Sequence, residues 1–133
     1  MANKIKKIQT EISAGELLDK ISILEIKLNK IKNNTSREKV KKEYKILIET
    51  KKSNIQINKK IQKLIKDIKY VNLNLWNIED KLRICEKNKD FGKKFVDLAR
   101  KVYFNNDKRA KIKSKINEVL GSNIREIKQY IKY

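Results

Sequence analysis

The sequence contains no histidine and no proline, and its 133 residues include one cysteine, three glycines and one tryptophan. Without histidine the chain lacks the base of Ser-His and Cys-His catalytic sites and a common nitrogen ligand of metals. The single cysteine, Cys85, excludes disulfide bonds and multi-thiolate zinc sites within one chain. We therefore predict no metal site and no cofactor, and we favour a binding protein over an enzyme.

Long apolar runs are also missing. No stretch approaches the roughly 20 apolar residues of a membrane span, and the N-terminus lacks the apolar core of a signal peptide. With 39% hydrophobic and 38% charged residues, the elements should be amphipathic, which favours helices over a parallel sheet. We predict one all-α domain without a membrane span, located in the cytoplasm.

The charge is strongly one-sided, with 35 Lys and Arg against 16 Asp and Glu, a formal net charge of +19. Such an excess is typical of proteins that bind nucleic acid or another polyanion. However, only five of these residues are arginine, whose forked guanidinium suits phosphates best. A lysine-rich, proline-free composition is also expected of an AT-rich coding sequence, so two interpretations of the charge stay open.

The first third of the chain predicts a basic arm at residues 1–12, followed by a helix at 13–33. The segment from Ser13 to Glu16 has the form of a capping box. Apolar residues then recur at steps of three and four up to Ile31. We expect this seam to pack along another helix.

Residues 36–88 contain neither glycine nor proline and predict a long helix, with a second capping box at 35–38. An apolar seam runs from Ile57 to Cys85, but it is out of phase with an earlier seam formed by Val40, Tyr44 and Leu47. The pattern allows either a break near Ser53 or a stutter in one helix. An unbroken helix would be about 80 Å long and would imply a homodimer paired through it.

The last third predicts two shorter helices at 91–105 and 107–120, with Asn106 or Asp107 as the N-cap of the second. Gly121 suits the C-terminal end of that helix. The tail at 122–133 could be helical or extended. The fold class predicted is all-α: an antiparallel helical hairpin or coiled-coil-like bundle with two shorter C-terminal helices.

Two polar clusters are candidate ligand sites. The first combines Trp76, Glu79, Asp80 and Arg83 with the flanks of the 13–33 helix, which carry Glu16, Asp19, Lys20 and Glu25. If the helices meet, these residues would either line a polar pocket or form an ion network that fixes helix register.

The second cluster lies at the expected turn between the last two helices and contains Arg100, Asn106, Asp107 and Arg109. Arginines beside a helix N-terminus can hold an anion, although local capping and pairing would explain the same residues.

A stripe of lysines opposite the apolar seam is the candidate nucleic-acid surface: Lys45, Lys52, Lys59, Lys63 and Lys66. A stripe of this kind could follow a phosphate backbone. It is also what the solvated face of any amphipathic helix shows.

Motifs along nearly the whole chain resemble a small bacterial family of helical proteins of unknown function, sometimes encoded near or fused to glycosyltransferase and surface-polysaccharide genes. They are GELLDKISILEIK at 15–27, LWNIED at 75–80, RICE at 83–86, DF at 90–91, LAR at 98–100, VY at 102–103, NDKRA at 106–110 and LGS at 120–122. The resemblance implies that the polar motif residues are the functional positions: Glu16, Asp19, Lys20, Glu25, Trp76, Glu79, Asp80, Arg83, Arg100, Asn106, Asp107 and Arg109.

These observations predict a non-enzymatic interaction or accessory protein whose polar residues bind an anionic ligand or a protein partner, and the resemblance links it to envelope glycan synthesis. One alternative is a nucleic-acid-binding protein that uses the lysine stripe. Another is a histidine-free enzyme acting on a phosphorylated or nucleotide-sugar substrate.

Overall fold

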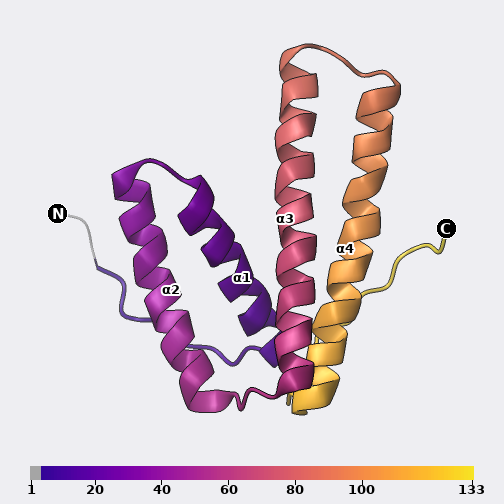
Figure 1. Cartoon of the computed structure of the whole chain (residues 1–133). Coiled ribbons are helices and arrows are strands. Elements are labelled where there is room, and N and C mark those ends of the chain that lie inside the picture. The colour runs from indigo at the N-terminus through magenta and orange to yellow at the C-terminus, as the bar shows by residue number, and fades with distance from the viewer. Residues whose placement is uncertain (1–3) are drawn as a thin grey trace.

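The computed structural model describes residues 4–133, and these form four α-helices and no strand (Figure 1). The helices are α1 (Ala14–Lys30), α2 (Asn34–Asn54), α3 (Lys59–Lys87) and α4 (Lys93–Leu120). They pack as a bundle, so the predicted all-α fold class is confirmed.

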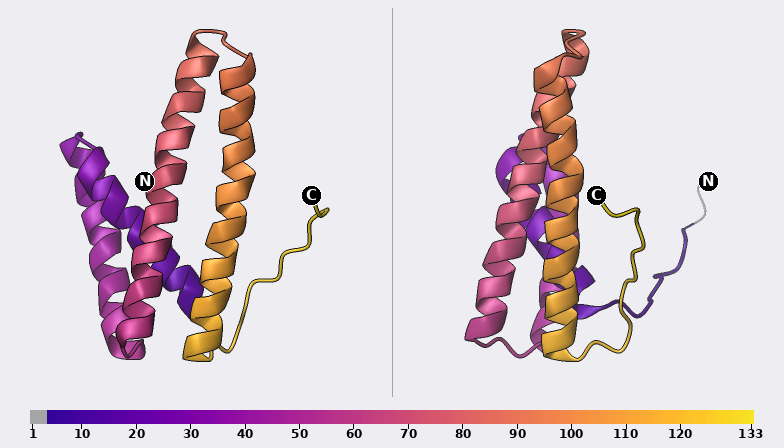
Figure 2. Two further views of the ribbon diagram at one scale, coloured as in Figure 1. Left: turned by 45° about the vertical axis from the view of Figure 1, so that its right-hand side comes forward. Right: turned by 90° about the vertical axis from the view of Figure 1, so that its right-hand side faces the viewer.

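Helix α1 lies at the centre of the bundle, because it contacts each of the other three helices. Helices α3 and α4 form a long hairpin that extends past the ends of the shorter α1–α2 pair (Figures 1 and 2). Only the lower part of the hairpin is therefore covered by α1.

The start of α1 follows the local signal in the sequence. Ser13 is the N-cap, and its side-chain oxygen accepts a hydrogen bond from the backbone N–H of Glu16 at 3.1 Å. The apolar residues Leu17, Leu18 and Ile21 are buried and join Ile61, Ile68 and Ile116 in the main core. A smaller core of Ile78, Cys85 and Leu98 holds the upper part of the hairpin together.

The region expected to form one long helix is divided into α2 and α3 by residues 55–58. Asn58 caps α3 by accepting a hydrogen bond from the N–H of Ile61, and Ile55 is extended at the end of α2. Of the two possibilities that the seam left open, the break is therefore the one observed. The second N-cap was wrongly placed at residue 35, since Asn33 caps α2.

The homodimer prediction rested on an unbroken 80 Å helix, and that helix does not exist. The seam of α3 packs instead against α1 and α4 of the same chain. Dimerisation stays a prediction without this argument.

The division of the C-terminal region into helices at 91–105 and 107–120 was wrong, because α4 is continuous from Lys93 to Leu120. Asn105 donates its side-chain amide to the carbonyl of Lys101, one turn earlier in the same helix, at 2.8 Å. Asparagine costs less than about 1 kcal/mol in a helix interior, which the packing of α4 along α3 outweighs. Gly121 ends α4 in the left-handed conformation, with φ of 63°.

The two chain ends have no helix or strand in the described residues 4–13 and 122–133. Both ends lie on the same side of the hairpin (Figure 2), where Asn123 donates to Glu11 at 2.9 Å. The tail also meets α4, where the Tyr133 hydroxyl donates to Asp107 and this bond raises the pKa of Tyr133 to about 12. Within the described chain, no helix is both long and apolar enough to cross a membrane.

Candidate functional site

A buried carboxylate joins three of the four helices. Asp19 of α1 is 0% exposed, and its two oxygens accept hydrogen bonds from Nε and Nη2 of Arg109 in α4, at 2.9 and 2.5 Å. Asn72 of α3 donates to the same carboxylate at 2.8 Å and to the Ser22 hydroxyl at 2.7 Å. The hydrogen bond to Asp19 raises the pKa of Arg109, which keeps this guanidinium charged.

A second ion cluster continues this network toward the chain ends. The Nζ atom of Lys113 lies 2.7 Å from Glu16, 3.0 Å from Glu126 in the tail, and 3.8 Å from Asp19. Burial lowers the pKa of Lys113, but its hydrogen bonds to Glu16 and Glu126 outweigh that effect and raise the pKa overall. The Glu16 carboxylate thus faces Lys113 across the α1–α4 contact.

Because Glu126 of the tail pairs with Lys113, we expect acid to loosen the tail. The hydrogen bond from Lys113 lowers the pKa of Glu126 below 4.5. This contribution to stability is present above the unfolded pKa and is lost as the pH falls through the lower, folded value. We expect the difference in urea midpoint between pH 6 and pH 3.5 to be smaller for Glu126→Gln than for the wild type.

Glu118→Gln is the matched control for the acid experiment, because Glu118 pairs with Lys115 at 3.5 Å on the exposed face of α4. Its pH dependence should follow the wild type. An equal pH dependence in Glu126→Gln and the wild type would contradict this role of the tail.

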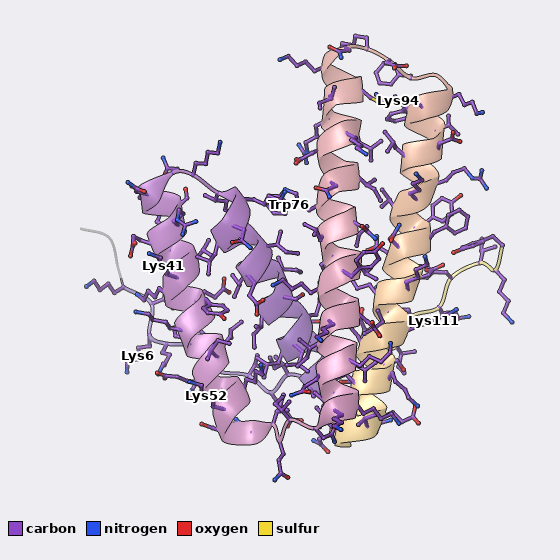
Figure 3. All side chains as sticks on the ribbon, in the orientation of Figure 1. Lys6, Lys41, Lys52, Trp76, Lys94 and Lys111 are labelled. Atoms are coloured by element: carbon purple, nitrogen blue, oxygen red, sulfur yellow. The ribbon has the colours of Figure 1, made fainter. Side chains whose placement is uncertain are left out.

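A groove opens beside the buried network, where α1 diverges from α3. It has a volume of about 540 Å³, within the range of small-molecule sites, roughly 300–1,000 Å³. Trp76 projects from α3 on the side that faces α1 (Figure 3). The lining residues are Ile23, Ile26, Asn72, Leu75, Trp76, Glu79, Asp80, Arg83 and Arg109.

Helical spacing explains why these α3 residues share one side. Asn72, Trp76, Glu79 and Arg83 follow one another at steps of four, three and four, so they lie on one face of α3. Before Asn72 this face is buried, whereas Glu79 and Arg83 are exposed. We call this site the Trp76 groove.

The charges of the Trp76 groove are nearly balanced. Glu79 and Asp80 carry two negative charges, and Arg83 and Arg109 carry two positive ones. Arg109 is already paired with Asp19. Of the two arginines in the groove, Arg83 is therefore the one that can pair with a ligand. The groove therefore offers both hydrogen-bond donors and acceptors without a strong positive field.

The structure brings together most of the first predicted cluster. Asp19, Trp76, Glu79, Asp80 and Arg83 lie in or beside the Trp76 groove. Elsewhere on α1, Glu25 pairs with Lys69 of α3 at 2.7 Å, Glu16 pairs with Lys113, and Lys20 is exposed.

The second predicted cluster lacks the helix N-terminus on which it was based. Its premise was a helix N-terminus near residue 106, but Arg100, Asn106, Asp107 and Arg109 all lie inside α4. Arg109 faces Asp19, whereas Asp107 accepts from Tyr133 of the tail, and Arg100 lies over the ring of Phe104 at 5.6 Å. The two arginines therefore serve different contacts.

The five lysines of the predicted stripe are exposed but do not share a helix. Lys45 and Lys52 lie on α2, whereas Lys59, Lys63 and Lys66 lie on α3, after the chain has turned at residues 55–58. Lys63 is also paired with Asp67 at 2.8 Å. The prediction of a continuous lysine stripe along one helix was therefore wrong.

Sequence reasoning missed several polar residues of the network: Ser22, Asn72, Lys113, Asn117 and Ser122. Asn117 and Ser122 accept from the backbone N–H groups of Gly15 and Ala14, at 2.7 and 2.8 Å. A usable signal existed for Asn72 and Asn117, because each stands directly beside a seam residue of its helix. In the described residues, no three carboxylate or thiol side chains gather closely enough to hold a metal ion.

Comparison with known proteins matches the sequence of the chain to one family. A family of unknown function, DUF6165, matches residues 8–132, which includes every residue of the network and of the Trp76 groove. No curated protein and no solved structure matches the chain.

Proposed function

We propose that this chain, which belongs to the DUF6165 family, is a non-enzymatic binding protein that holds a saccharide in the Trp76 groove. The observation that carries the proposal is the position of Trp76 beside two exposed carboxylates and an arginine. The apolar C–H face of a sugar ring stacks on an indole, and carboxylates and guanidinium groups pair with its hydroxyls.

The balance of charge favours a neutral, hydroxyl-rich ligand over the anionic one expected from the sequence. An anion entering the groove would meet Glu79 and Asp80 next to Arg83, and like charges disfavour it. A neutral saccharide uses both kinds of group. The proposed ligand class is also consistent with a role in envelope glycan synthesis, which the family resemblance implied.

Binding is favoured over catalysis because of where the carboxylates lie. Asp19 is the buried carboxylate of the described chain, and both of its oxygens are already held by Arg109 and Asn72. Glu79 and Asp80 are exposed to solvent at the edge of the groove. The groove thus offers contacts rather than a reactive group.

The proposal predicts that saccharides change the fluorescence of Trp76, the single tryptophan of the chain. Neutral oligosaccharides and uronate-containing oligosaccharides are titrated while the emission is recorded. We expect neutral ligands to bind at least as tightly as uronates. The double variant Glu79→Gln/Asp80→Asn should weaken neutral binding by about tenfold, since each group supplies a hydrogen bond to the ligand.

Asp67→Asn is the matched control, because Asp67 lies on α3 outside the groove and pairs with Lys63. It should bind as the wild type does. Tighter binding of uronates would favour the anionic ligand instead. Titrations in which no saccharide alters the Trp76 emission or binds by calorimetry would reject the proposal.

A further inference from the structure

A second, larger groove lies on another side of the α3–α4 hairpin and shares no lining residue with the Trp76 groove. Its volume is about 910 Å³, and its walls come from α3, α4 and the C-terminal tail. Figure 3 shows the two sides, with Trp76 between α3 and α1 and Lys111 on the far side of α4, near the tail.

The charge of this groove is strongly positive. Five lysines line it, Lys81 from α3, Lys101, Lys108 and Lys111 from α4, and Lys128 from the tail. Asp107 is the one carboxylate among the lining residues, and it accepts a hydrogen bond from Tyr133. Three chain segments therefore aim positive charge at one concave surface.

One of the lining lysines, Lys128, has a carboxylate partner, since it lies 3.6 Å from Glu126. In the described residues, Lys41, Lys63, Lys69, Lys113 and Lys115 each lie within 4 Å of a carboxylate. The four lining lysines of α3 and α4 have no such partner there, like most lysines of the described chain. Because positive charges outnumber the single carboxylate in this lining, the groove attracts an anion.

Most of the other lining residues carry aromatic rings or amides, beside the aliphatic Ile78 and Ala110. Phe104, Tyr130 and Tyr133 supply rings, and Asn74 and Asn77 supply amides from α3. A nucleobase stacks on such rings and pairs with amides, whereas ammonium groups bind phosphates as point charges. A volume of this order suits a small molecule rather than a duplex.

We infer that the groove between α3, α4 and the tail binds a nucleoside diphosphate, with the lysines on the phosphates and the aromatic rings on the base. The inference does not depend on the Trp76 groove or on its ligand. It assigns part of the +19 charge to one site.

The test is calorimetric titration with ADP and with inorganic pyrophosphate at physiological salt. We expect ADP to bind, and pyrophosphate to compete for the same site. Lys101→Glu/Lys108→Glu should weaken both probes at least tenfold. Tyr130→Ala, at a residue that is 70% exposed, should weaken the binding of ADP more than that of pyrophosphate.

The matched control is Lys45→Glu/Lys52→Glu, which changes the net charge by the same amount at two exposed lysines of α2. It should retain ADP binding. An equal loss in both double variants would overturn the inference, because the attraction would then follow net charge alone. A single-stranded oligonucleotide that binds where ADP does not would also overturn it, in favour of a nucleic-acid surface.

Discussion

Replacing Asp19 with asparagine is expected to lower the free energy of unfolding by about 3–5 kcal/mol, the usual loss when one partner of a buried ion pair is removed. The shape of the side chain is kept, but the charge that holds Arg109 is gone. The Arg109 side chain, 28% exposed, is then left partly buried without its counter-ion, and Lys113 loses a nearby carboxylate as well. Urea unfolding followed by circular dichroism measures the loss.

A double-mutant cycle separates the ion pair from general damage to the core. Arg109→Met should also be strongly destabilising, because it leaves the fully buried Asp19 charge without its main partner. The combined variant should cost less than the sum of the two single changes, since neither charge is then left alone.

The control for the cycle is Glu38→Gln. It removes an exposed pair with Lys41 at 3.3 Å and should change stability by less than about 0.5 kcal/mol. A loss below about 1 kcal/mol for Asp19→Asn would show that the network contributes little to the fold.

Features of the fold that depend on neighbouring residues were predictable from the sequence. The Ser13 cap and the seam of α1 follow from groups within a few residues of one another. The seam from Ile61 to Cys85 likewise supplies the core-facing side of α3. The continuity of α4 was missed because Asn105 and Asn106 favour a helix end locally, and only packing along α3 overrides that preference.

The site was predictable in its residues but not in its pairings. Asp19 and Arg109, which lie 90 residues apart in the sequence, were both recognised as candidates but were assigned to different clusters. Nothing in the local pattern shows which carboxylate an arginine meets, because that depends on how α1 crosses α4. Trp76, Glu79 and Arg83 were grouped correctly because they share one helix face.

The crossing of α1 and α4 depends on Gly15, and Gly15→Ala is expected to cost about 2–4 kcal/mol. A Cβ atom at this position would lie 2.6 Å from the Lys113 carbonyl oxygen and 2.9 Å from Oδ1 of Asn117. The two helices would have to separate, which strains the packing by about 1–3 kcal/mol and weakens the hydrogen bond from the Gly15 N–H to Asn117. The better helix propensity of alanine returns only about 0.5–1 kcal/mol.

Gly92→Ala provides the matched control for this substitution. At Gly92 the nearest atom to an added Cβ is Oδ1 of Asp90 at 3.6 Å, an ordinary contact, and φ is −80°. The change should therefore alter stability by about 0.5 kcal/mol or less, since the lower backbone freedom of the unfolded chain offsets a weaker N-cap. Equal urea midpoints for the two variants would contradict the close crossing. A lower urea midpoint for Gly15→Ala alone would support the close contact between α1 and α4, the two helices that carry Asp19 and Arg109.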